Sequence, residues 1–515
     1  MKMNNSHIMK LASLVMAIAI IGTGCTQTGQ KADLQAAVIS TTETDDTEAV
    51  ADYQTFFEEG VVHAIDVTIT EDDWADILAN PEDEIYHEAK VTIDGVIADT
   101  VGIRTKGNSS LKSVASSESD RFSFKIKLDA FVEDQTMLGL DEFVLNNMFS
   151  DASYMREYLS YKIMGEAGLA VPLSSFVEVS INGEFYGLYL MVEAIEDSYL
   201  NRAFGENEGN LYKQEQGSTL VYETDKVYES SEQKNGDDES KTDLANFIKI
   251  LNEMPDGEKG DIESVLNVDS ALKYIAANTV LENYDSYNGS FAQNYYLYNL
   301  SDQFNVSPWD FNMAFGGFQG GTLSTIDIDT PISGTSLDKV PLIQNLLEVE
   351  DYKARYYEII EDYLAILEDF ETEVSALKTL IKPSVEADPT KFATIEQFDL
   401  VTTYQEDGPV EANEEGGFMG MDKGMGESND SDANTGASEN ATLPSGEQPM
   451  PNGDMPNGER PNGDWAKGMR PEGAPPENGL GNGGMRGGMS LTGSTTSLIN
   501  IMRARIASLQ EQLAN

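Results

Sequence analysis

The chain has 515 residues, of which 40% are hydrophobic and 9% aromatic, so it is long enough to bury one large core or two ordinary ones. Its 89 acidic and 33 basic residues give a formal net charge of -56 at pH 7, which argues against nucleic acid as a partner because such a surface repels phosphates. With one cysteine, Cys25, and three histidines, the chain offers little basis for disulfides, cysteine-based zinc sites or Ser-His-Asp hydrolysis.

The N-terminus has the form of an export signal: a short basic start, the apolar run LASLVMAIAII and then GTGC, which ends at Cys25. The run is short for a membrane span. Small residues before a lone Cys resemble a bacterial lipobox, although Gly22 stands where Leu is usual, and the alternative is an ordinary cleaved signal. We predict a lipoprotein signal peptide over 1–24, lipidation of Cys25 that anchors the protein to the outer face of the bacterial cell membrane, and a flexible acidic tether over 25–55.

The segment 56–404 mixes strand and helix patterns, which predicts an α+β globular domain. Strand-like alternation covers three segments: 87–95, 101–110 and 121–129. On the last of these, Lys125 and Lys127 share a face with Arg121 and Ser123. Such a face is most often exposed to solvent, so the lysines alone are weak signals of a site.

Helices and a hairpin follow along the chain. Met155, Leu159 and Ile163 form one apolar stripe in the helical pattern over 153–168. A hairpin with its turn at Asn182-Gly183 is expected next. This hairpin covers 176–195. The remaining predicted elements are a helix over 269–283, paired strands over 294–300 and 303–311, and helix over 350–381.

The composition changes over 405–492. Between residues 405 and 490 lie 19 of the 44 glycines and 9 of the 17 prolines, with few large apolar residues, so we predict a disordered Gly/Pro/Asn/Met-rich insertion. Its methionines are irregularly spaced, which makes copper binding a poor interpretation. Helical spacing of apolar residues returns over 493–515 and predicts a final helix that packs back onto the domain.

The stretch 281–317 carries the strongest chemical pattern. Asp285 and Asn294 lie in a loop after a predicted helix, and Asp310 precedes Phe311 after a predicted hairpin. Phosphoryl transfer needs a carboxylate near the attacking hydroxyl, and an amide oxygen with a second carboxylate to hold Mg²⁺. Protein kinases present these groups in the same order, but here His-Arg is missing before the loop Asp, and Asn312 follows where kinases have Gly. Turn capping and surface ion pairs are the alternative roles.

Upstream segments add a lysine strand, a helix and a hairpin in the order that a kinase requires. The strand over 121–129 offers Lys125 or Lys127 for the phosphates, and LYLMVEAI, which contains Glu193, resembles the hinge. Each of these is weak alone, since a lysine on an alternating strand usually faces solvent.

Together these segments resemble the CotH kinase family, known from spore coat assembly and from bacterial exported proteins. The most specific pieces are VEVSINGEFYGLYLMVEAIE and SPWDFNMAFGG, and IRTKGNSS, FSFKIKL, SYMREYLSYKIMGEAGL and NYDSYNGSFAQNYYLYN match in the same order. The resemblance implies an atypical protein-kinase-like fold, with a mixed N-terminal sheet lobe and a helical C-terminal lobe over 56–404, that binds ATP with Mg²⁺ or Mn²⁺.

Roles carried over from the family resemblance are as follows. Asp285 is implied as the catalytic residue, and Asp310 and Asn294 as the metal ligands. The residues implied to bind ATP are Lys125, preferred over Lys127, with Lys106, Arg104 and Glu193. One of Arg156 and Glu157 is implied to order the strand lysine. Lys106 stands where the family often has Arg, and Asn312 where it often has a second Asp.

The function expected from these features is transfer of the ATP γ-phosphate to Ser or Thr residues of exported or surface proteins. The acidic charge favours basic, Ser-rich protein substrates, although solubility alone also accounts for acidity. The alternative is a non-catalytic surface scaffold with a degenerate kinase fold. A carbohydrate-active enzyme with paired carboxylates agrees with export and acidity but not with the family resemblance.

Overall fold

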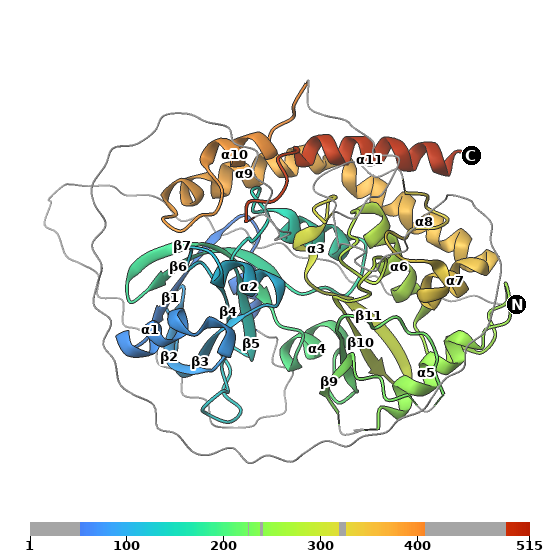
Figure 1. Ribbon diagram of the computed structural model, residues 1–515, viewed down its shortest axis with the longest axis horizontal. Coiled ribbons are helices and arrows are strands. Elements are labelled where there is room, and N and C mark those ends of the chain that lie inside the picture. The colour runs from blue at the N-terminus through green and yellow to red at the C-terminus, as the bar shows by residue number, and fades with distance from the viewer. Residues whose placement is uncertain (1–51, 225, 237–239, 319–325, 407–490) are drawn as a thin grey trace, which may run out of the picture.

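The computed structural model describes residues 52–224, 226–236, 240–318, 326–406 and 491–515. The predicted signal peptide, Cys25 and nearly all of the predicted tether and insertion lie outside the described residues. Figure 1 shows a barrel and a smaller sheet beside each other, with a layer of helices along one edge of both. The predicted α+β class is confirmed. Among the described helices, none is long and apolar enough to cross a bilayer.

Seven strands close into a barrel in the order β1-β2-β3-β4-β5-β7-β6. β1 runs parallel to β6, from Val62 opposite Phe176 to Val67 opposite Ile181, and the other neighbours are antiparallel. The strands are β1 (Val62–Thr68), β2 (His87–Ile93), β3 (Val96–Lys106), β4 (Ser123–Lys127), β5 (Glu142–Asn146), β6 (Ser174–Ile181) and β7 (Glu184–Glu193). The sequence predicts a mixed sheet here, but it does not predict that this sheet closes into a barrel.

A four-stranded sheet of order β11-β10-β8-β9 follows, and helices surround it. Its strands are β8 (Leu211–Gln214), β9 (Ser231–Asn235), β10 (Tyr295–Leu300) and β11 (Gln303–Pro308). The helices are α1 (Glu71–Ala79), α2 (Ser109–Ala115), α3 (Arg156–Glu166), α4 (Asp197–Phe204), α5 (Thr242–Asn252), α6 (Val268–Val280), α7 (Pro341–Glu348), α8 (Glu350–Ile366), α9 (Phe370–Ala387), α10 (Ile395–Val401) and α11 (Leu498–Leu513).

Local signals place several elements as predicted. The hairpin β6–β7 turns at Asn182-Gly183, both with positive φ (53° and 80°), as a tight hairpin requires. α6 begins after Asn267, whose side chain accepts a hydrogen bond from the amide of Ser270. The helix predicted over 350–381 is instead two helices, α8 and α9, separated by a 3-10 turn at Leu367–Asp369.

The strand predicted over 121–129 differs from the prediction in two ways. It is the fourth strand of the barrel, because β1, which was not predicted, precedes the three predicted strands. Arg121 also lies outside the strand and is fully buried, so it does not share an exposed face with Lys125 and Lys127. The Arg121 guanidinium donates to Asp388 at 2.8 Å and lies 4.6 Å from the ring centroid of Tyr189. This ion pair joins the barrel to the residue that ends α9.

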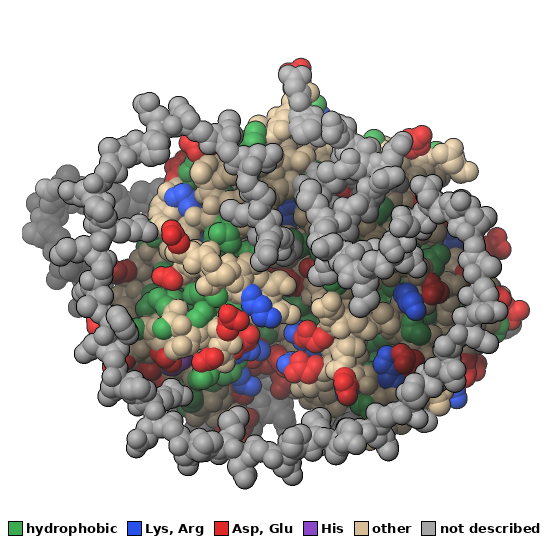
Figure 2. All heavy atoms as spheres, viewed as in Figure 1, with side chains coloured by type: hydrophobic (Ala, Val, Ile, Leu, Met, Phe, Trp, Pro, Cys, Tyr) green, Lys and Arg blue, Asp and Glu red, His purple; other side chains and the backbone are tan. Residues whose placement is uncertain are grey.

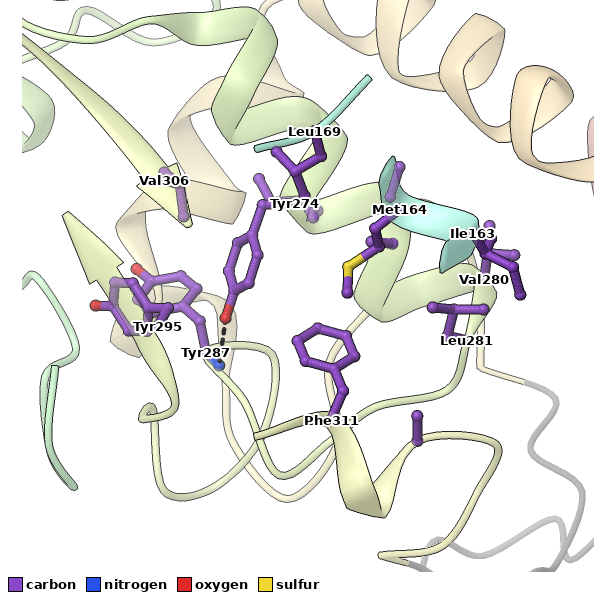
Figure 3. Close-up of a cluster of buried hydrophobic side chains, with 14 of the residues drawn as sticks. Ile163, Met164, Leu169, Tyr274, Val280, Leu281, Tyr287, Tyr295, Val306 and Phe311 are labelled. Atoms are coloured by element: carbon purple, nitrogen blue, oxygen red, sulfur yellow. Dashed lines mark hydrogen bonds between the residues drawn. The ribbon is translucent and has the colours of Figure 1, made fainter. Parts of the chain in front are cut away.

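The larger hydrophobic core fills the space between α3, α6, α8 and the second sheet. Figure 3 shows Phe311 directed toward Met164 of α3, with Leu281 and Tyr274 close by. These side chains anchor the chain before Asp285 and after Asp310. α11 packs on α6 and α9, and Leu498, Met502 and Leu509 are buried there. A smaller core fills the barrel.

Replacing Arg121 with Met should lower the free energy of unfolding by about 3–5 kcal/mol, because it leaves the buried Asp388 carboxylate without its guanidinium partner. Urea unfolding measures the change. The matched control is Lys127→Met, which removes the exposed Lys127–Asp129 pair and should cost less than about 1 kcal/mol. Equal effects of the two substitutions would show that the buried pair has no special role.

Candidate functional site

A cavity of about 850 Å³ opens between the barrel and the second sheet. Figure 2 shows acidic and basic side chains gathered on the molecular face between these two parts. Of the seven residues predicted to bind ATP, metal or the substrate hydroxyl, six line this cavity: Arg104, Lys106, Lys125, Asp285, Asn294 and Asp310. They come from β3, β4 and two loops of the second sheet region, so folding brings together residues up to about 200 positions apart in the printed sequence.

Lys106 lies at the end of β3 and is partly buried. Its Nζ donates to Asn146 Oδ1 at 3.0 Å, and Asn146 Nδ2 donates to Glu157 Oε2 at 2.7 Å. Burial lowers the pKa of Lys106, while the carboxylates of Asp310 and Glu157 oppose that shift. An amide therefore bridges a strand lysine to a helix glutamate inside the cavity.

Glu157 connects this bridge to the metal-ligand candidate. Burial, and then the nearby charge of Asp310, raise the pKa of Glu157. The hydroxyl of Tyr161, one turn further along α3, donates to Glu157 Oε1 at 3.2 Å and accepts the backbone N–H of Asp310 at 3.0 Å. α3 thus holds Asp310 in place through Tyr161. It also connects Asp310 to Lys106, through Glu157 and Asn146.

Asp285 lies in the loop after α6. Gln293 Nε2 donates to Asp285 Oδ1 at 2.7 Å, and Asn294 Nδ2 donates to the carbonyl oxygen of Asp285 at 2.7 Å. The backbone N–H of Asn294 donates to the backbone carbonyl oxygen of Gln214 on β8. Burial, and then the charge of Asp310, raise the pKa of Asp285 to about 7. This carboxyl group can therefore gain and lose a proton near neutral pH.

The donor set at Asp310 and Asn294 fits a hard divalent cation, which prefers carboxylate and amide oxygens. The side-chain nitrogen of Asn294 is bonded to Asp285, so its oxygen is the atom left to coordinate. Asp310, two residues after the end of β11, has φ of 57° in a left-handed conformation. In the described ranges no three His, Cys, Asp or Glu residues form a metal-binding cluster.

The other predicted ATP-binding residues are placed differently. Lys125 lines the cavity and forms an ion pair with Glu142 at 2.5 Å. Arg104 pairs with Glu84 at the cavity wall. Glu193 does not line the cavity: its carboxylate accepts from Arg202 and, at 2.6 Å, from Tyr53. The structure therefore does not bring Glu193 together with the other site residues, although its neighbour Ala194 lines the cavity.

The sequence prediction omitted Asn146 and Tyr161 from the site. Asn146 ends β5, a strand in which every residue is buried, and a polar residue at such a point is a usable signal. Tyr161 lies at i+4 from Glu157, on the same face of a helix, so its position follows once Glu157 is placed. Gly107, Asn108 and the first two residues of α2, Ser109 and Ser110, also line the cavity beside Lys106.

Comparisons with known proteins place the chain in one family. A family model described as "CotH kinase protein" matches residues 103–412, which include every cavity residue named as a candidate. The inner spore coat protein H of Bacillus subtilis (strain 168) is 28% identical over 283 residues, which are 52% of this chain and 76% of that protein. The matched family range ends before α11.

Replacing Asp285 with Asn should make the protein more stable at pH 8, by about 1–3 kcal/mol. The folded-state pKa near 7 exceeds the ordinary value, so the folded state holds a proton that the unfolded chain releases above about pH 4. The stability of the parent protein therefore falls between about pH 4 and pH 7 relative to the variant.

Urea unfolding of parent and variant across this pH range measures the difference. Asp302→Asn, at the exposed β10–β11 turn, is the matched control. A stability difference for Asp285→Asn that stays constant with pH would contradict the raised pKa.

Proposed function

Because the chain belongs to the CotH kinase protein family, we propose that it is an ATP-dependent kinase that phosphorylates Ser or Thr residues of exported or surface proteins. The observation that carries the proposal is one cavity in which Lys106, Glu157, Asp285, Asn294 and Asp310 meet from separate elements. In this proposal the barrel with α3 forms the N-terminal lobe of a kinase-like fold, and the second sheet with the remaining helices forms the C-terminal lobe.

Each residue has a role that follows from its surroundings. Lys106 binds phosphate oxygens, and Asn146 and Glu157 hold its ammonium group in place. Asp310 and Asn294 hold Mg²⁺ or Mn²⁺, which neutralises charge on the phosphates of ATP when bound. Asp285, oriented by Gln293, accepts the hydrogen bond of the substrate hydroxyl and directs its oxygen at the γ-phosphorus.

Lys125 has a second role at the cavity wall. Its ammonium group already pairs with Glu142, so it neutralises that buried carboxylate and supports the nucleotide from the barrel side. Lys106 faces Asp310 and Glu157 instead. The residue that matches a kinase phosphate-binding lysine by its surroundings is therefore Lys106, and Lys125 is the auxiliary cation.

The proposed setting is the outer face of the bacterial cell membrane, reached through the signal peptide and a lipid anchor at Cys25. The similarity to an inner spore coat protein supports an exported or surface location. Proposed substrates are basic, Ser-rich proteins, since the chain has a formal net charge of -56.

Replacing Asp310 with Asn should reduce phosphoryl transfer at least ~100-fold, because a neutral amide binds the divalent cation more weakly. The assay follows labelled phosphate from ATP, with Mg²⁺ or Mn²⁺, on the chain without residues 1–24 and on a basic Ser-rich protein. A chelator should abolish transfer by the parent, and Asp302→Asn should leave it unchanged. Absence of both transfer and metal-dependent ATP binding in the parent would favour the non-catalytic surface scaffold.

Replacing Lys106 with Met should reduce kcat/KM for ATP more than Lys125→Met does, by roughly tenfold between the two variants. The reason is that Lys106 lies beside Asp310 and Glu157, whereas Lys125 pairs with Glu142. Lys127→Met is the control, because Lys127 pairs with Asp129 and does not line the cavity. A larger loss for Lys125→Met would reverse the assignment of the two lysines.

A further inference from the structure

Arg505 of α11 is a fully buried arginine that reaches into the end of α6. Its Nη2 and Nε donate to the carbonyl oxygen of Thr279 at 2.8 and 3.2 Å, and Nη1 donates to the carbonyl oxygen of Ile326 at 3.2 Å. Its Nε lies 3.7 Å from Glu282 Oε1, and both side chains are at most 1% exposed. A charge this deep in the protein is tolerated only with such partners.

These contacts are at the point where α6 gives way to the loop of Asp285. The last carbonyl groups of a helix have no partner within it, and a cation there also interacts favourably with the helix dipole. Arg505 supplies that cation to Thr279. Glu282, three residues before Asp285, adopts a left-handed backbone with φ of 50° and is held by the guanidinium.

Leu281 and Glu282, at this end of α6, also bind the backbone that follows Asp310. The amide of Phe315 donates to the carbonyl of Leu281 at 2.6 Å, and the amide of Gly316 donates to the carbonyl of Glu282 at 3.3 Å. Arg156 Nη1 of α3 donates to the carbonyl groups of Ala314 and Phe315 at 2.7 and 3.1 Å. The loops of Asp285 and Asp310 are therefore bonded to each other, and each of them also contacts a buried arginine.

α11 holds a second contact to the same region. Gln512 Oε1 accepts the amide of Ile328 at 2.8 Å, next to the carbonyl of Ile326 that Arg505 binds. The family match ends at residue 412, so α11 lies outside the matched range.

We propose that Arg505 is a positioning residue that sets the geometry of Asp285 and Asp310 through Glu282 and the end of α6. Arg505 does not line the cavity. This inference rests on the proposed kinase function for its catalytic consequence, whereas the local order of the two loops is independent of activity. The C-terminal helix thereby completes the active site from outside the matched family range.

The test compares Arg505→Gln with Arg503→Gln in the full chain without residues 1–24. Arg503 lies on the same helix, but its side chain is 52% exposed and pairs with Glu371. Arg505→Gln should lower kcat on the order of 100-fold, because displaced catalytic groups lose alignment with the substrate. KM for ATP should stay within about twofold, since Lys106 is held by other residues. Arg505→Lys should restore part of kcat.

Hydrogen exchange gives a readout that needs no activity. Arg505→Gln should speed exchange at the amides of Asn283, Phe315 and Gly316, which bond to Asn278, Leu281 and Glu282, and Arg503→Gln should not. If Arg505→Gln does not fold, Glu282→Gln replaces it, because that variant removes the ion pair and leaves the Arg505 bonds to Thr279 and Ile326.

The outcomes separate the two proposals. Absence of phosphoryl transfer by the parent would refute the kinase function, and the exchange data would still decide whether Arg505 orders the loops. Transfer by the parent, with Arg505→Gln equal to Arg503→Gln in both kcat and exchange, would overturn the positioning role. A fall in kcat accompanied by an equal rise in KM for ATP would also overturn it, since that pattern indicates general disruption.

Discussion

The burial of charge in α3 is the constraint on which the candidate site depends. Arg156 and Glu157 are adjacent, and both are nearly inaccessible to solvent. Because an unpaired buried charge costs several kcal/mol, each must be met by groups at fixed positions. Arg156 meets Asp151 and the carbonyl groups after Asp310, and Glu157 meets Asn146 and Tyr161. The start of α3 thereby relates the barrel lysine to the loop of Asp310.

Much of the fold could be predicted from local patterns. The hairpin at Asn182-Gly183, α6 and the β10–β11 pair follow from turn chemistry and periodicity within short windows. Closure of the barrel could not be predicted, because β1 pairs with β6, which is more than one hundred residues away. Neither strand has a sequence pattern that identifies the strand it pairs with. The burial of Arg121 was missed for the same reason, since its partner Asp388 is distant in sequence.

The candidate site divides along similar lines. The order of Asp285, Asn294 and Asp310 along one stretch, with the family resemblance, was enough to select residues that line one cavity. The lysine that binds phosphate was harder to predict, because strand alternation suits Lys106, Lys125 and Lys127 equally well. Only the packing of the folded chain shows which carboxylate lies next to each lysine. Glu193 shows the converse: it lies in a segment that resembles the family, but its carboxylate is bound by Arg202 and Tyr53 and does not line the cavity.

The parallel pairing of β1 with β6 has a consequence for how the chain can be divided. The family match begins at residue 103, within β3, so a fragment cut at that boundary would lack β1 and β2. Such a fragment would present β3 and β6 as two unsatisfied sheet edges, each a template for pairing with another molecule. The strands that precede the matched range therefore protect the protein against self-association, a role independent of any chemistry in the cavity.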